Sequence, residues 1–254
     1  MQIDRYELLE VVGEGATGVV YRASGDVAVK VLREPDPVLV RRFRREVEIA
    51  RTLSSRHLVP ILEVGDGFFV MPYFERGSLA GAPPLSVAEL GRLAAELGQA
   101  LDMLHAAGIV HRDVKPSNVL LADDGALLGD FGLARGANST QLTRDGQLVG
   151  TAHYLAPELI EGEPATPASD VYAFACLLYE AATGAPPFAG RADAEIGYAH
   201  LVEEPPPPDL AAPVAEAILA GLAKEPGERP TTATALARML HLASTSAPSS
   251  PSGG

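Results

Sequence analysis

The sequence predicts an α+β fold with two lobes: a small β-rich N-terminal lobe with one key helix, and a larger, mainly helical C-terminal lobe. Up to about residue 72, short apolar runs alternate with glycine-rich turns, whereas beyond residue 78 apolar residues recur at helical spacing. The 254 residues, 47% of them apolar, are enough to bury the core that such a fold needs. We therefore expect a cleft between the lobes and a hinge at about 72–77.

The N-terminal lobe, at about 1–72, is predicted to consist of short strands and one helix. A tight Ser-Gly-Asp turn lies inside an apolar stretch, so residues 19–32 predict a hairpin. Residues 38–54 carry an apolar stripe at helical spacing. Two further apolar runs, 59–65 and 68–74, meet at a Gly-Asp-Gly turn and predict two more strands.

The C-terminal lobe, at about 78–243, is predicted to begin with a long amphipathic helix, because Ser86 and Glu89 form a capping-box pattern ahead of it. A hairpin should follow, with its turn at 123–125. Further helical patterns lie at 170–183, 213–223 and 231–242. The first of these is apolar nearly all round and predicts a buried helix. Residues 244–254 are rich in Ser, Pro and Gly and predict a flexible tail or linker.

Charge and composition exclude several classes of protein. The net charge of −13 argues against a general nucleic-acid binder, since phosphates would be repelled. The single cysteine, Cys176, excludes a disulfide framework and suits the reducing cytoplasm. We see no secretory signal and no membrane-spanning apolar run, so no membrane contact by this segment is expected. Five arginines at 41–51 are best interpreted as a solvated helix face; a phosphate-accepting face is the alternative.

Three glycines and a lysine near the N-terminus are candidates for phosphate binding. Gly13, Gly15 and Gly18 would let the backbone approach a phosphate closely, although such a pattern also occurs in ordinary turns. Because a strand follows them, a loop folded over phosphates fits better than a dinucleotide-binding loop, which opens a helix. Lys30 interrupts an apolar strand, either as an edge residue or as a phosphate ligand oriented by Glu46.

Four charged or amide residues lie at the ends of the short hairpin: Asp113, Lys115, Asn118 and Asp130. Each could be a capping, turn or surface residue. Two carboxylates beside a nucleotide would repel its phosphates unless a cation lay between them, and Mg²⁺ takes one or two carboxylates with phosphate oxygens. Asp130 and Asn118 suit that cation. Asp113 would then accept a hydrogen bond from an incoming hydroxyl, while Lys115 offsets phosphoryl charge.

The motifs, taken together and in order, resemble those of protein kinases, and specifically the bacterial Hanks-type Ser/Thr kinases. They read GEGATGVV, VAVK, FRRE, HRDVKPSN, DFG, GTAHYLAPE, SDVYAF and ERP. The resemblance implies the bilobal protein-kinase fold, with a kinase domain at 1–243. It also implies transfer of the γ-phosphate of ATP to protein Ser/Thr hydroxyls in bacterial signalling, with Mg²⁺, or alternatively Mn²⁺, as the cation.

The resemblance further implies which residues bind ATP. The three glycines would cover the phosphates, and Lys30 would contact them while paired with Glu46. The base site would be lined by Val12, Val20, Ala28, Met71, Pro72, Phe74 and Leu120, with Met71 as gatekeeper. Pro72 stands where many relatives carry an acidic residue. Since its carbonyl is retained, we expect ATP binding to survive.

The remaining roles are also taken from the resemblance. Asp113 would be the catalytic base, Lys115 would contact the γ-phosphate, and Thr151 would bridge the two. Asn118 and Asp130 would hold the metal. Four residues would be structural: Arg112, Glu158, Asp170 and Arg229. Arg112 would receive an activating phosphate. Glu158 would pair with Arg229, and Asp170 would anchor the catalytic loop.

Regulation is predicted in the hydroxyl-rich stretch 137–148. A phosphate on Thr140, Thr143 or Ser139 would carry about −1.5 to −2 charges and could pair with Arg112. Such kinases can self-associate transiently and phosphorylate in trans. The segment would be cytoplasmic, and it could also be the intracellular domain of a longer, membrane-anchored protein.

Two other functions compete with the active protein kinase. A nucleotide-binding pseudokinase or scaffold would be expected to lack Lys30, Asp113 or Asp130, and all three are present. A small-molecule phosphotransferase of related fold would not need GTAHYLAPE, which in protein kinases is a platform for peptide docking.

Overall fold

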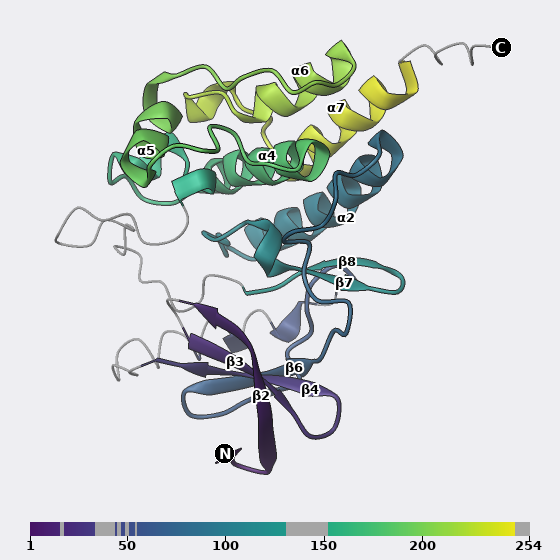
Figure 1. Cartoon of the computed structure of the whole chain (residues 1–254), viewed down its shortest axis with the longest axis vertical. Helices are drawn as coiled ribbons and strands as arrows, with labels where there is room; N and C mark the ends of the chain where they lie inside the picture. Colours follow the sequence, from purple (N-terminus) through teal and green to yellow (C-terminus); the bar gives the residue numbers. More distant parts are fainter. Residues whose placement is uncertain are drawn as a thin grey trace.

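An antiparallel sheet forms the N-terminal lobe, and helices form the larger lobe stacked on it (Figure 1). The computed structural model describes residues 1–15, 18–33, 44, 47–48, 51–53, 55–130 and 152–246. The sheet has the order β1-β2-β3-β4-β6-β5. Its strands are β1 (Gln2–Ile3), β2 (Tyr6–Gly15), β3 (Gly18–Ala23), β4 (Val27–Leu32), β5 (Glu63–Val64) and β6 (Phe68–Pro72). The predicted two-lobed α+β fold is confirmed.

The sheet has two different faces because side chains alternate along each strand. One face holds a small core of its own, made of Leu8, Ala23, Val29, Phe68 and Val70. The alternate residues of β3, β4 and β6 face the helical lobe. The predicted hairpin at 19–32 is confirmed as β3 and β4, paired in a register that sets Val20 opposite Lys30.

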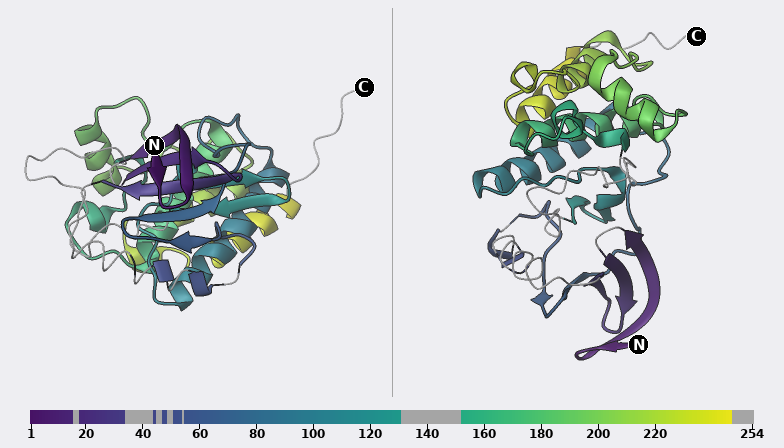
Figure 2. Two further views of the ribbon diagram at one scale, coloured as in Figure 1. Left: turned by 90° about the horizontal axis from the view of Figure 1, so that it is seen from below. Right: turned by 90° about the vertical axis from the view of Figure 1, so that its left-hand side faces the viewer.

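The C-terminal lobe begins with α2 (Val87–Ala106), which starts at the predicted capping box. The Glu89 carboxylate accepts from the Ser86 backbone N–H at 2.9 Å, and the Glu89 N–H donates to Ser86 Oγ at 3.4 Å. The predicted hairpin follows as β7 (Val119–Ala122) and β8 (Gly125–Leu128), and lies between α2 and the N-terminal sheet (Figures 1 and 2). The other α-helices in the described part of this lobe are α3 (Pro157–Ile160), α4 (Pro167–Thr183), α5 (Asp193–Val202), α6 (Ala212–Gly221) and α7 (Ala233–Ser246).

The helical core is packed around α4 and α2. Residues on every side of α4 are buried, including Tyr172, Phe174, Leu177 and Leu178, as its apolar sequence predicted. The helix α7 approaches α2 closely at Gly98, where an added Cβ would lie 3.1 Å from the Ala233 carbonyl oxygen. Figure 2 shows α2, α4, α6 and α7 layered on the side of the hairpin away from the sheet.

Several boundaries differ from the predictions. The run 59–65 yields only the two residues of β5, because its first part bonds to the other lobe: the Val59 N–H donates to the Leu128 carbonyl at 2.9 Å. The sequence did not predict α3 or α5. The last helix continues to Ser246, three residues into the predicted tail.

The predicted helix at 38–54 lies largely outside the described residues; of those described there, residues 44, 47–48 and 51–52 are helical. Within the described part of the chain, no helix has the length and apolarity needed to cross a membrane.

Candidate active site

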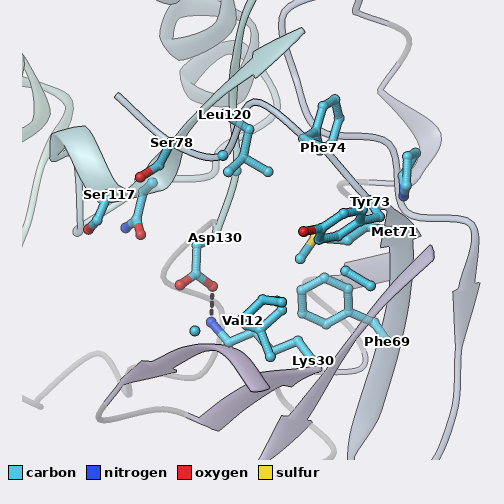
Figure 3. A pocket seen from close by; sticks show the side chains of 17 residues that line it. Val12, Lys30, Phe69, Met71, Tyr73, Phe74, Ser78, Ser117, Leu120 and Asp130 are labelled. Atoms are coloured by element: carbon cyan, nitrogen blue, oxygen red, sulfur yellow. Dashed lines mark hydrogen bonds and ion pairs between the residues drawn. The ribbon is translucent and has the colours of Figure 1, made fainter. Parts of the chain in front are cut away.

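A cavity of about 250 Å³ lies between the lobes and is lined by residues of both (Figure 3). The sheet, the segment after β6 and the β7–β8 hairpin all contribute to it. One end is apolar, and the other carries Lys30, Asn118 and Asp130. This division suits a ligand with a flat apolar part and an anionic part.

Most of the residues predicted to bind nucleotide line this cavity. They are Val12, Gly13, Val20, Ala28, Lys30, Met71, Pro72, Phe74 and Leu120. Six further lining residues were missed: Phe69, Tyr73, Gly77, Ser78, Ser117 and Gly129. Strand alternation could have identified Phe69 and Tyr73, since both share a face with Met71. The two serines carry no sequence signal that distinguishes them from loop residues.

Gly15 and Gly18 are not among the described residues that line the cavity. Gly18 also lies close to the backbone of a neighbouring strand in the sheet. A Cβ at Gly18 would lie 2.2 Å from the Val31 carbonyl oxygen on the neighbouring strand. At Gly15 an added Cβ would meet none of the described atoms within 4 Å.

We therefore predict opposite results for two matched substitutions. Gly18→Ala should lower the free energy of unfolding by about 1–3 kcal/mol, because the methyl group overlaps backbone that cannot move aside alone. Gly15→Ala should change it by less than about 0.5 kcal/mol. Thermal unfolding of both variants checks this, and equal melting temperatures would contradict the packing role of Gly18.

Lys30 and Asp130 form an ion pair across the cavity, although 100 positions separate them in the sequence (Figure 3). Lys30 is only 5% exposed. Burial raises the pKa of Asp130, but the Lys30 ammonium outweighs this effect, so the pKa lies below its ordinary value and the carboxylate stays ionised. Glu46, the predicted partner of Lys30, lies outside the described residues.

Asp113, Lys115 and Asn118 meet in one loop. Lys115 Nζ lies 2.9 Å from Asp113 Oδ2. The Asn118 side-chain amide donates to the Asp113 backbone carbonyl at 2.7 Å and to its Oδ2 at 3.0 Å. A 3₁₀ turn, Pro116–Asn118, directs the amide back toward Asp113. Asp113 is therefore held in place by two neighbours of its own loop.

Asp170, at the start of α4, anchors the backbone of this loop. Its carboxylate accepts from the N–H groups of His111 at 2.7 Å and Arg112 at 2.8 Å, and from His105 Nε2 at 2.7 Å. Arg112 has a φ of 66°, which is unfavourable for a residue with a side chain. The bonds to Asp170 help to hold that conformation.

His111 connects the loop to the strand end that carries Asp130. Burial lowers the pKa of His111 and keeps its ring neutral. Nε2 lies 3.0 Å from the Gly129 carbonyl, and Nδ1 lies 3.3 Å from the Asp113 N–H. The ring therefore donates through Nε2 to Gly129 and accepts through Nδ1 from Asp113, which fixes its tautomer.

Glu158 and Arg229 form a bidentate ion pair deep in the helical lobe. Both N···O distances are 2.7 Å. Arg229 also donates to the carbonyls of Ala168, Ala223 and Lys224 at 2.8–2.9 Å. Burial raises the pKa of Glu158, but the hydrogen bonds to Arg229 lower it by more than burial raises it. The pKa of Glu158 therefore lies below its ordinary value. The pair joins α3 to the segment before α7.

The donor set at the charged end fits a divalent cation. Asp130 offers a carboxylate and Asn118 an amide oxygen, both on the cavity wall, and Mg²⁺ prefers such hard oxygen ligands. Clusters of three or more His, Cys, Asp or Glu that could hold a metal do not occur among the described residues. Thr151 and the candidate phosphosites Ser139, Thr140 and Thr143 lie outside the described ranges.

Comparisons with known proteins agree on the family. The family model for the protein kinase domain matches residues 6–240. The serine/threonine-protein kinase PknB of Mycobacterium leprae is 35% identical over 276 residues, covering 98% of this chain and 44% of that protein. The probable PknB of Corynebacterium glutamicum is 36% identical, covering 93% of this chain and 42% of that protein. The chain thus spans less than half the length of these curated relatives.

A solved structure agrees in the fold. The crystal structure of a single-substitution mutant of the Mycobacterium tuberculosis PknI kinase domain superposes with a TM-score of 0.71 at 28% identity, covering 94% of this chain and 95% of that one. Its arrangement of lobes is the one described here. The chain therefore belongs to the protein kinase family, in the bacterial Hanks-type branch that its motifs predicted.

Proposed function

We propose that this chain transfers the γ-phosphate of ATP to Ser and Thr hydroxyls of protein substrates, with Mg²⁺, or alternatively Mn²⁺, as the cation. One observation carries the proposal: Lys30, Asn118 and Asp130 converge on one cavity, beside a loop that holds Asp113 and Lys115. We place the kinase domain at 1–243, with the lobes joined at 72–77.

The apolar end of the cavity would take the adenine ring. Val20 and Ala28 lie on the sheet side and Leu120 on the hairpin side, so a flat ring fits between them. The backbone of Pro72 and Phe74 would hydrogen-bond the edge of the base. Lys30 would contact the phosphates, because its ammonium is already held at the charged end by Asp130.

Transfer would take place at Asp113. Its carboxylate would accept the hydrogen bond of the incoming hydroxyl and orient that oxygen toward the phosphorus. Lys115, 2.9 Å away, would offset the charge that builds on the transferred group. When bound by Asn118 and Asp130, a divalent cation supplies charge neutralisation on the phosphate oxygens.

A transfer assay with γ-labelled ATP, Mg²⁺ and a generic protein substrate tests the function. We expect label on Ser and Thr and none on Tyr. Nucleotide binding without transfer to any protein, under conditions where a control kinase is active, would favour the pseudokinase. Label on a small molecule but on no protein would favour the phosphotransferase.

We also predict autophosphorylation in trans, on Ser139, Thr140 or Thr143. A phosphate there could pair with Arg112, which lies beside Asp113 in the loop and has a charge suited to it. Mass spectrometry of protein incubated with ATP–Mg²⁺ should find phosphate in this stretch, at a rate per molecule that rises with protein concentration. An otherwise active protein with no phosphate between residues 131 and 150 would contradict the prediction.

A further inference from the structure

We infer that Arg22 is a positioning residue for the nucleotide, because it stacks on Tyr73 and so fixes the outer rim of the base-binding end of the cavity. The inference rests on the proposed function, in which this cavity takes ATP. Arg22 itself is not among the residues that line the cavity. Its effect would pass through Tyr73, which does line it (Figure 3).

The strand register places Arg22 on the cavity face of the sheet. Val20 and Arg22 are two residues apart in β3 and so point to the same side. In the pairing with β4, Val20 lies opposite Lys30, and Arg22 lies opposite Ala28. Because Val20, Ala28 and Lys30 all line the cavity, Arg22 belongs to the same surface. It stands at the end remote from Lys30.

Tyr73 meets Arg22 from the hinge. The guanidinium carbon of Arg22 lies 4.7 Å from the centroid of the Tyr73 ring, within the range of a cation–π interaction. The Tyr73 backbone is fixed separately, since its N–H donates to the Asp26 carbonyl at 3.0 Å in the turn between β3 and β4. The backbone is thus tied to the sheet by Asp26, and the ring by Arg22.

A third residue extends this contact toward the glycine-rich strand. Glu10 of β2 is paired with Arg22 in the sheet, and their charged groups lie 3.7 Å apart. The Glu10 side chain is 63% exposed, so this ion pair contributes little by itself. The same strand carries Val12 and Gly13 to the cavity. Arg22 thus contacts both Glu10 and Tyr73, and we expect nucleotide binding to depend on the contact with Tyr73.

The position of the stack predicts which kinetic constant depends on it. Arg22 and Tyr73 stand at the base-binding end, away from the pair of Lys30 and Asp130 where the phosphates would lie. We therefore expect their contact to stay the same during phosphoryl transfer. Losing it should weaken nucleotide binding equally in the ground and transition states, which raises KM and leaves kcat unchanged.

The test compares the affinity of variants for a non-hydrolysable ATP analogue by calorimetry, with KM and kcat measured alongside. A partly exposed cation–π contact predicts a loss of about two- to fivefold for Arg22→Ala. Tyr73→Leu should lose at least as much, because Tyr73 itself lines the cavity, and the double variant should lose no more than Tyr73→Leu. Tyr73→Phe, which keeps the ring that Arg22 stacks on, should lose less affinity than Tyr73→Leu. Arg92→Ala, at an exposed position on α2, is the matched control and should bind like the parent.

Three results would overturn the inference. Arg22→Ala could bind as tightly as the parent, the losses in the double variant could multiply as for independent sites, or kcat could fall while KM stays constant. Melting temperatures of all variants separate loss of folded protein from loss of affinity. If the parent binds no nucleotide, the proposed function fails too. Parent-like binding by Arg22→Ala would overturn this inference alone.

Discussion

Asp113→Asn is expected to lower kcat for phosphoryl transfer by about 10²–10⁴-fold while nucleotide affinity stays close to that of the parent. The substitution keeps the shape of the side chain but removes its charge and its strength as a proton acceptor. Asp113 is 8% exposed, and its Oδ2 lies within 3.0 Å of Lys115 and Asn118. Since it does not line the nucleotide cavity, the loss should appear in the transfer step rather than in binding.

The measurement is single-turnover transfer of labelled phosphate to a protein substrate, beside the affinity for a non-hydrolysable ATP analogue. Asp124→Asn provides a matched control, since it makes the same chemical change at an exposed position in the hairpin turn. This control should transfer phosphate like the parent. If Asp113→Asn were as active as Asp124→Asn, Asp113 could not be the catalytic base.

The sequence predicts best where local chemistry decides the structure. The Ser86–Glu89 capping box marks the start of α2 because both partners of each hydrogen bond lie within one turn. The hairpin at 19–32 is likewise set by a tight turn between two apolar runs. The composition of α4 indicates burial on all sides, and the helix is buried on all sides.

Prediction from sequence is weaker where contacts between distant segments decide the structure. The run 59–65 has the composition of a strand, yet Pro60 has no N–H to donate and Val59 bonds to β8 of the other lobe. At Gly18, the glycine-rich motif does not reveal that an added Cβ would lie 2.2 Å from the Val31 carbonyl oxygen across the sheet. Neither contact can be seen from the neighbouring residues in the sequence.

The candidate site shows the same difference between what local sequence determines and what distant contacts determine. The residue types at Lys30, Asp113, Asn118 and Asp130 are readable from their motifs, but the groups that hold them are not. Asp170 anchors the loop that carries Asp113 through the N–H of His111, which lies 59 positions earlier in the sequence. These supporting contacts depend on how α4 packs, and packing is fixed by the whole helical lobe rather than by any local pattern.

Arg229→Ala is expected to lower the free energy of unfolding by about 3–5 kcal/mol, because it leaves the Glu158 carboxylate buried without its partner. The Arg229 side chain is fully buried, and that of Glu158 is 10% exposed. The substitution also removes three hydrogen bonds to backbone carbonyls. Glu158→Gln keeps those three bonds, so it should cost less than Arg229→Ala. Arg238→Ala, at an exposed position on α7, should cost less than about 0.5 kcal/mol.

The dependence of these losses on pH provides an independent check. The folded pKa of Glu158 lies below its ordinary value of 4.5, so its ionised form adds stability above that value and loses it as the pH falls toward the folded pKa. The difference in unfolding free energy between the parent and Glu158→Gln should therefore be constant near neutral pH and shrink below about pH 4.5. Denaturant unfolding at a series of pH values measures it. A difference that stayed constant down to the acid transition of the parent would show that the charge on Glu158 is not what stabilises the lobe.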